Sequence, residues 1–201
     1  KTSLAYLYWR ETGDLSVWKG VIQDAIVMNV DDMGCVGCVE NILLSSTIGR
    51  NANRIPGEVL NALIQGTSDF LDSMKDVGID IHLTGGETAD VGDIVRTVDV
   101  GFTTFARLPR KNLVVNSIQA GQAILGLSSF GQASYEHEYN GGMGSNGLTS
   151  ARHDLFHSDY GKKYPESLDA EHHKDMRYVG PYHLQDEVQL PDGSKTTVGK
   201  L

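Results

Sequence analysis

The chain has 201 residues, 40% of them hydrophobic, which is ample for a core and allows one large domain or one domain with an incomplete second. Its net charge of −9 and pI near 5.1 argue against nucleic acid or an anionic membrane as the main partner. No run of about 18 apolar residues occurs, so the sequence predicts no membrane-spanning segment.

The chain begins at Lys1 with neither an initiator methionine nor a charged-then-apolar leader, and we expect its front to be cut. Its only cysteines are Cys35 and Cys38. Such a pair can form a redox centre or half of a zinc site, but no second pair exists to complete the site. We therefore interpret both as half-buried residues near a helix end. Two cysteines and no leader indicate a reducing compartment, and we predict a cytoplasmic protein.

Hydrophobic periodicity and chain breakers predict strands and helices. The clearest element is a helix after Pro56, because its apolar residues repeat at helical spacing as far as Met74 and Gly78 suits its C-cap. Ser16 is a candidate N-cap for an earlier helix. The predicted elements are strands at 1–9, 39–48, 79–83, 96–106 and 122–127 (the last one buried), and helices at 16–33, between residues 56 and 78, and at 146–156.

The strand at 79–83 runs into Thr-Gly-Gly-Glu-Thr-Ala-Asp at 84–90, which we interpret as a glycine-rich turn. Glycine permits positive φ and lets the backbone come close to a ligand. A carboxylate on such a turn can reach a hard cation, and successive N–H groups can hold phosphate oxygens. The pattern is neither a Walker loop nor a dinucleotide fingerprint, so it indicates a different way of holding a nucleotide.

Five acidic residues are candidates for a magnesium site. Three of them fall in the C-terminal half of the helix at 16–33, where negative charge opposes the helix dipole and needs solvent or a cation. Mg²⁺ is commonly held by a few carboxylates and shared with nucleotide phosphates. Solvated surface acids are the alternative in so acidic a chain, and spacing leaves both open. The five are Asp24, Asp31, Asp32, Glu87 and Asp90.

Two glycine- and serine-rich stretches, at 128–131 and 141–147, bracket an insertion at 132–140. The insertion is either a lid that faces an anion or a mobile surface loop. His153 and His157 stand four residues apart on the following helix and could face one metal, although a solvent-facing pair is favoured because the glutamate of a zincin motif is missing. The polar stretch at 158–201 is interpreted as a linker and connecting strand that lead toward an absent second domain.

These segments carry a family resemblance. Gly-Gly-Glu-Thr-Ala-Asp at 85–90 resembles the GGETAE motif of the aminoimidazole ribonucleotide synthetases, or phosphoribosylformylglycinamidine cyclo-ligases. Ser128-Ser129, followed by Ser-Asn-Gly-Leu at 145–148 and then Arg152, resembles that family's SSGLHSNGYSLVR segment. Three further segments resemble the family and come in the correct order: Lys1, then Asp24, then Val-Asp-Asp at 30–32 followed by Gly37. The likeness covers about residues 1–157.

The resemblance implies an N-terminal α+β domain at 1–157, in which a mixed, mainly antiparallel sheet is covered by helices. It also implies that two such sheets pair across a homodimer, and that a second α/β domain follows the linker at 158–201. The implied reaction is the ATP-dependent cyclisation of formylglycinamidine ribonucleotide to aminoimidazole ribonucleotide in purine biosynthesis, with release of ADP and phosphate.

The resemblance also implies where ATP and Mg²⁺ bind, whereas no residue stands out as the general base. By this likeness the metal ligands are Asp32, Glu87 and Asp90. The residues expected at ATP are Lys1, Asp32, Glu87, Thr88, Ser145, Asn146 and Gly147.

Two departures from the family pattern leave the substrate open. Gly144 stands where the family commonly has a histidine, and the insertion at 132–140 is additional. We hypothesise that His137 of the insertion replaces the missing imidazole. The alternatives are an enzyme of the same fold with another substrate, or a non-catalytic nucleotide-binding homologue.

Overall fold

The computed structural model describes all residues except 135, 137, 138, 140, 170, 172–176 and 191–192. Within the described part, no helix is both long and apolar enough to cross a membrane. The elements in chain order are α1 (Thr2–Thr12), α2 (Val17–Cys35), β1 (Ile42–Arg50), α3 (Gly57–Asp76), β2 (Ile81–Asp90), β3 (Val98–Phe105), η1 (Arg110–Asn112), η2 (Ser145–Gly147), α4 (Leu148–Leu155), α5 (Asp159–Lys163), η3 (Pro165–Ser167), β4 (Glu187–Gln189) and β5 (Lys195–Thr197).

The main sheet is three-stranded and mixed, with β1 at its centre. β2 pairs with β1 in parallel, and β3 pairs with β1 antiparallel. The parallel partners β1 and β2 are joined through α3, as a parallel pair requires a crossover connection. The predicted α+β class with a mixed sheet is confirmed, and one pair of each kind makes up this sheet.

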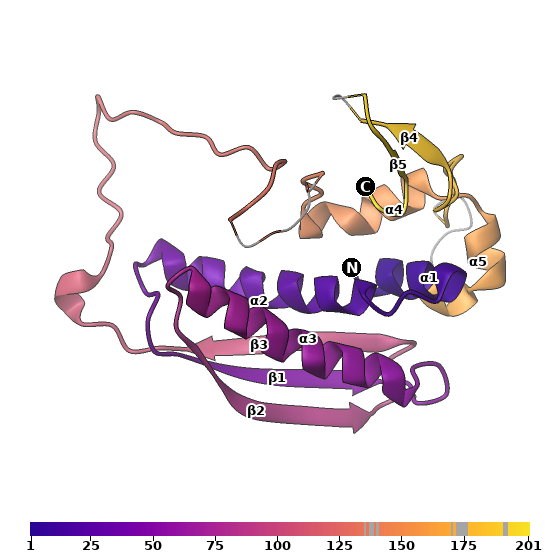
Figure 1. The fold of residues 1–201 in the computed structure, drawn as a ribbon, viewed down its shortest axis with the longest axis horizontal. Helices are drawn as coiled ribbons and strands as arrows, with labels where there is room; N and C mark the ends of the chain where they lie inside the picture. Colours follow the sequence, from indigo (N-terminus) through magenta and orange to yellow (C-terminus); the bar gives the residue numbers. More distant parts are fainter. Residues whose placement is uncertain (135, 137–138, 140, 170, 172–176, 191–192) are drawn as a thin grey trace.

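Helices α2 and α3 cover one face of the sheet (Figure 1). Trp18, Ile22 and Ile26 of α2 are fully buried at a spacing of four residues, which places them on one side of the helix. β1 alternates in the same way, because Ile42 and Leu44 are buried while Leu43 between them is exposed. The predictions of both helices and of the strands at β1 and β3 are confirmed.

The prediction of a strand at residues 1–9 is wrong, because this segment forms helix α1. An apolar run of this length fits a buried strand or a buried helix equally, and packing decides between them. Here Tyr6 and Leu7 are fully buried, and the ring of Trp9 meets the ring of Trp18 on α2 edge-on. Gly13 ends the helix with φ +74°, and its N–H donates to the carbonyl of Trp9 at 2.7 Å.

The prediction of a buried strand at 122–127 is also wrong. Ile124, Leu125 and Leu127 are each more than nine-tenths exposed, and this part of the chain has no strand structure. The long connection that contains it extends away from the helices and the sheet (Figure 1). A strand needs a hydrogen-bonded neighbour, and no described segment pairs with these residues.

The segment after residue 157 folds against α1. Tyr160, Tyr164 and Leu184 are buried there, and Tyr164 packs edge-on against Tyr6 of α1. Tyr178 is fully buried at φ +47°, and its hydroxyl accepts a hydrogen bond from Arg152 at 2.7 Å. The proposed boundary at 157 itself stays a prediction.

A buried carboxylate fastens this segment to α1. The side chain of Glu166 is only 7% exposed, and its Oε1 accepts a hydrogen bond from the Tyr6 hydroxyl at 2.6 Å. Arg54 Nη1 lies 3.1 Å from the same oxygen, and Arg10 Nη1 lies 3.8 Å from it. Burial tends to raise the pKa of Glu166, but the Tyr6 hydrogen bond and the two arginines hold that pKa below its ordinary value.

We expect Glu166→Gln to lower the free energy of unfolding at pH 7 by about 1–3 kcal/mol, because a charge-assisted buried network loses its acceptor. A lowered folded-state pKa stabilises the fold above the unfolded pKa of about 4.3 and ceases to do so as pH falls through the folded value. The difference between variant and wild type should therefore shrink below about pH 4. Urea unfolding at several pH values measures it.

The matched control is Glu187→Gln, which breaks the exposed Lys195–Glu187 pair at 2.9 Å. Exposed pairs contribute less than about 1 kcal/mol, so this variant should stay close to wild type. An equal loss in both variants would contradict the role given to Glu166.

Candidate functional site

Lys1 and Ser145, which are far apart in sequence, meet beside α2. The ammonium of Lys1 lies 2.8 Å from Asp24 Oδ2 and 3.0 Å from the sulfur of Met28. Ser145 Oγ approaches the same sulfur at 3.7 Å from the start of the α4 segment. Two of the residues predicted to hold ATP, Lys1 and Ser145, are thus brought together.

Ser145, Asn146 and Gly147 form the single turn η2, which continues directly into α4. The first N–H groups of a helix have no partner within the helix, and such a start attracts anions. A lysine ammonium, a serine hydroxyl and these N–H groups are donors suited to phosphate oxygens. The donor set around Lys1 and Ser145 therefore fits a nucleotide phosphate.

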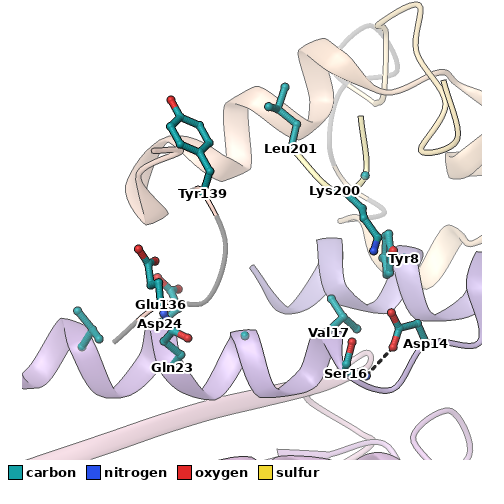
Figure 2. A pocket seen from close by; sticks show the side chains of 13 residues that line it. Tyr8, Asp14, Ser16, Val17, Gln23, Asp24, Glu136, Tyr139, Lys200 and Leu201 are labelled. Carbon is teal, nitrogen blue, oxygen red and sulfur yellow. Dashed lines mark hydrogen bonds between the residues drawn. The ribbon is translucent and has the colours of Figure 1, made fainter. Parts of the chain in front are cut away.

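An open pocket of about 660 Å³ adjoins this cluster (Figure 2). Its floor is the polar side of α2, including Gln23 and Asp24, and Tyr8 of α1 contributes to one wall. Glu136 and Tyr139 of the insertion also line it, as does Lys200. The insertion at 132–140 thus contributes two described residues to the pocket, whereas His137 lies outside the described residues.

The loop before α2 is organised by Asp14 rather than by Ser16. Ser16 occupies the N-cap position, but its side chain makes no capping hydrogen bond. Asp14 Oδ1 instead accepts the backbone N–H of Ser16 at 2.8 Å, and the hydrogen bonds from Ser16 hold the pKa of Asp14 below its ordinary value. Asp14 therefore stays ionised at neutral pH on the pocket wall.

The glycine-rich stretch at 84–90 is part of strand β2, so our interpretation of it as a turn is wrong. Residues 86–90 pair in register with 46–50 of β1, after a register shift beside Leu44. Gly85 adopts φ +103° at this irregularity, a region that favours glycine. A Cβ on Gly86 would collide with the backbone carbonyl of Ser46. Both glycines are therefore required by the strand pairing itself.

The acidic residues of β2 do not join the cluster at Lys1. Glu87 pairs with Thr47 and Asp90 with Arg50, and residues three apart in a strand point to opposite faces. Asp90 Oδ1 accepts the N–H of Ala52 at 3.1 Å, and both acidic residues are exposed. Figure 1 shows α2 between the sheet and α4. The layer of helices therefore separates Glu87 from Ser145 within one chain.

The remaining predicted ligands are scattered as well. Asp31 and Asp32 are exposed near the end of α2, beyond Asp24. In the part of the chain that the structure describes, the only three His, Cys, Asp or Glu side chains close enough to hold one ion are elsewhere, and none of the five predicted acids is among them. Cys35 is exposed and Cys38 buried at the end of α2, and neither forms a disulfide.

The histidine pair on α4 is split between two environments. His153 is buried, stacks on the ring of Tyr178 and accepts the Tyr178 N–H at 3.3 Å. His157 lies beyond the end of α4 and faces residues of other elements. The i, i+4 pair therefore does not point together at a metal or at solvent, because the helix ends between its members.

A family model described as "AIR synthase related protein, N-terminal domain" matches residues 5–108, which is more than half of the chain. The chain belongs to this family. Among curated relatives, the phosphoribosylformylglycinamidine cyclo-ligase of Pyrococcus furiosus is 33% identical over 143 residues, covering 70% of this chain and 36% of the relative. That of Thermococcus kodakarensis is 32% identical over 143 residues, with the same coverages of 70% and 36%.

The cyclo-ligase of Methanocaldococcus jannaschii is 27% identical over 135 residues, covering 66% of this chain and 33% of the relative. The chain thus spans about a third of the length of these relatives. Helices α1 to α3 and the whole three-stranded sheet lie within or at the edge of the segment matched by the AIR synthase family model. Segment η2, with Ser145, lies beyond it.

The structure leaves room for a histidine at position 144. Gly144 has φ −64°, an ordinary value for any residue, and a Cβ built on it would meet no atom within 4 Å. An imidazole could therefore occupy this position without displacing the backbone.

The glycines of β2 generate a testable difference. We expect Gly86→Ala to lower the free energy of unfolding by about 1–3 kcal/mol, because the new methyl group must displace the β1 backbone at Ser46. Gly101→Ala on β3 is the matched control, since the nearest atom to its new Cβ is Thr47 O at 4.0 Å. Urea unfolding of both variants tests this, and equal stabilities would contradict the steric role of Gly86.

Proposed function

We propose that the protein containing this sequence catalyses the ATP-dependent ring closure of formylglycinamidine ribonucleotide to aminoimidazole ribonucleotide, with release of ADP and phosphate. The printed names of the relatives support this reaction for a family member. The observation that carries it in this chain is the approach of Ser145 and Lys1 to one another beside Met28. These residues come from two segments in which the sequence resembles the cyclo-ligases.

In this proposal the nucleotide phosphates bind where Lys1 meets the turn at Ser145–Gly147. The ammonium of Lys1 would move from Asp24 to a phosphate oxygen, and the hydroxyl of Ser145 would donate to another. Asn146 adds a side-chain amide with donor and acceptor groups. The adjoining pocket of about 660 Å³ has room for the rest of a nucleotide.

Mg²⁺ would neutralise charge on the phosphates and on the transferring phosphoryl group. The carboxylates of Asp32, Glu87 and Asp90 have the right chemistry for this ion, although the chain does not gather them around one point. Mg²⁺ is usually bound by one or two carboxylates together with substrate phosphates and water, so three converging carboxylates are not required. Thr88 next to Glu87 completes the proposed set on β2.

The chemistry asks the protein mainly to hold reactants in place. The γ-phosphoryl group of ATP passes to the amide oxygen of the substrate, and ADP leaves. A nitrogen of the same substrate then attacks the activated carbon, the carbon–oxygen bond breaks, and phosphate departs. Alignment of nucleophile and carbon can supply up to about 7–11 kcal/mol. We assign no general base.

We also propose a cytoplasmic homodimer that forms through the uncovered face of the sheet. Leu43 on β1 is 41% exposed and its partner in register, Phe105 on β3, is 60% exposed, both on the face away from α2 and α3. Exposed apolar side chains on a sheet face favour coverage by another surface. Glu87 lies on this face too, so a second chain would approach it.

The first test follows ADP release by the natural protein that contains this sequence, with Mg-ATP, in the presence and absence of formylglycinamidine ribonucleotide. We expect ADP release that depends on this substrate and yields the aminoimidazole product. ATP binding without substrate-dependent release would favour an enzyme with a different substrate, to which Gly144 and the insertion at 132–140 point. No ATP binding would favour a non-catalytic homologue that binds another nucleotide or a partner.

A second prediction addresses the nucleotide residues. We expect Ser145→Ala and Asn146→Ala each to weaken Mg-ATP binding by about tenfold, because each removes a hydrogen bond worth about 1.4 kcal/mol to a charged group. Isothermal titration with Mg-ATP measures the affinity. Ser150→Ala is the matched control on the same segment, since its hydroxyl faces Asp154 at 3.3 Å. An equal effect of all three substitutions would count against the site.

A further inference from the structure

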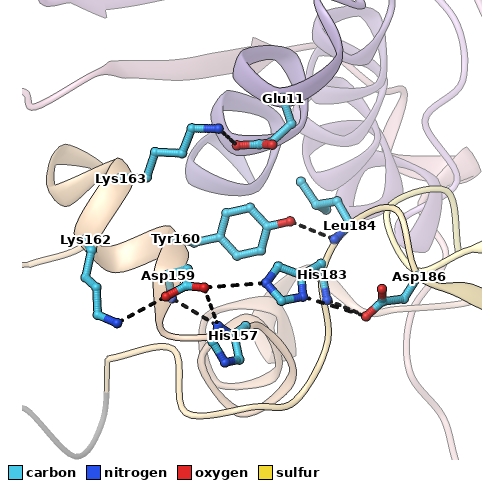
Figure 3. Close-up of polar contacts among 9 residues, drawn as sticks. All are labelled: Glu11, His157, Asp159, Tyr160, Lys162, Lys163, His183, Leu184 and Asp186. Atoms are coloured by element: carbon cyan, nitrogen blue, oxygen red, sulfur yellow. Dashed lines mark hydrogen bonds and ion pairs between the residues drawn. The ribbon is translucent and has the colours of Figure 1, made fainter.

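A second group of side chains, apart from the nucleotide site, faces one common point (Figure 3). His157 follows α4, Asp159 is the first residue of α5, and His183 lies on the segment before β4. The potential ligand atoms of these three residues all lie within 4.8 Å of one another. Within the described ranges of the chain, no other set of three such residues does so.

The distances suit a small divalent ion. His157 Nδ1 lies 3.1 Å from Asp159 Oδ2, and His183 Nε2 lies 3.9 Å from the same oxygen. Zinc bonds of about 2.0–2.1 Å in tetrahedral geometry place neighbouring ligand atoms roughly 3.3 Å apart. The two observed distances bracket that value, and rotation of the half-exposed side chains can bring the three ligand atoms, now within 4.8 Å of one another, closer together.

One nitrogen of His157 meets both the backbone and the carboxylate of Asp159. The backbone N–H of Asp159 donates to His157 Nδ1 at 3.3 Å, which uses that nitrogen as an acceptor. The same nitrogen faces the Asp159 carboxylate oxygen at 3.1 Å. A proton on Nδ1 satisfies the contact with the carboxylate oxygen, and a cation can take the place of that proton. Because His183 Nε2 faces the same oxygen, one cation there can be shared by both histidines.

Outer contacts orient two of the three side chains, those of Asp159 and His183. Lys162 Nζ lies 3.1 Å from Asp159 Oδ1, so Oδ2 is the oxygen left to face the histidines. Asp186 accepts the backbone N–H of His183 at 2.7 Å, and its Oδ2 lies 3.9 Å from His183 Nδ1. A carboxylate beside the far nitrogen of a metal-bound histidine is a common arrangement that fixes the ring and its tautomer.

The backbone that carries the cluster is held firmly. The N–H of His157 donates to the carbonyl of Tyr182 at 2.8 Å, and that of Leu184 donates to the buried Tyr160 hydroxyl at 2.8 Å. The rings of His157 and His183 stack with centroids 4.7 Å apart. The three side chains are each about half exposed, so an ion can reach them from solvent.

We propose that His157, Asp159 and His183 bind one divalent transition-metal ion, with Zn²⁺ as the best fit. Two imidazoles and one carboxylate suit zinc and its neighbours rather than Mg²⁺, which prefers oxygen ligands. Three protein ligands leave a fourth position for water. The ion ties the junction of α4 and α5 to the segment before β4. This site is independent of the proposed ATP chemistry.

The test is isothermal titration of the metal-free full chain with Zn²⁺, together with the visible absorption of bound Co²⁺. We expect one saturable ion per chain at this site, with micromolar or tighter affinity, and the intense absorption of a tetrahedral centre. Asp159→Asn and His183→Ala should each weaken Zn²⁺ binding at least tenfold while far-ultraviolet circular dichroism stays unchanged. Both side chains are about half exposed, so we expect the fold to tolerate these substitutions.

The matched control uses the exposed pair of His82 and Asp80, whose side chains also approach to 3.1 Å but have no third ligand among the described residues. His82→Ala and Asp80→Asn should leave Zn²⁺ affinity unchanged. The proposal is overturned if the wild type binds no Zn²⁺, or if Asp159→Asn and His183→Ala bind it as tightly as the wild type. Zn²⁺ held by histidines elsewhere in the chain would give the second of these results.

Discussion

The burial of one side of α2 against the sheet is the constraint on which the candidate site depends. Trp18, Ile22 and Ile26 are removed from water completely, and burial of such side chains stabilises by about 1.5–3 kcal/mol each. Helical periodicity then fixes where every other residue of α2 points. With 18, 22 and 26 inward, Gln23 and Asp24 line the pocket and Asp24 meets Lys1. The polar floor of the pocket thus follows from the hydrophobic packing beneath it.

Strand β2 illustrates how a motif can have a structural cause besides a chemical one. Its glycines suggest a ligand-binding turn, yet Gly86 is needed because the β1 backbone at Ser46 leaves no space for a side chain. Gly85 takes up the register shift with positive φ. Once the strand is formed, Glu87 is directed to the uncovered face and Asp90 to the other. For both residues to bind magnesium, further ligands would therefore have to come from phosphates or from residues outside the helix layer of this chain.

The sequence predicted elements well wherever local periodicity was unambiguous, as in α2, α3, β1 and β3. It failed at α1, where an apolar run fits helix and strand alike, and at 122–127, where composition favoured a strand but no partner strand pairs with it. The anchors of the C-terminal segment were missed because isolated tyrosines such as Tyr160 and Tyr164 form no stripe. The meeting of Lys1 with Ser145 links residues 144 positions apart, which only a family resemblance could suggest. The sequence pairs His157 with His153, whereas its neighbour in the structure is His183, because that proximity depends on how the chain folds back.

Helix α4 connects the two candidate sites. It begins directly after the nucleotide turn and ends two residues before His157, so its eight residues, about 12 Å of helix, lie between the two sites. Arg152 fixes the middle of this helix by donating to the Tyr178 hydroxyl at 2.7 Å and to the Ser167 carbonyl at 2.9 Å. An ion at His157 would hold the end of α4 that lies away from the pocket. Because α4 is short and moves as one piece, its packing on the C-terminal segment helps to set the position of Ser145. Contacts with α2 set it as well.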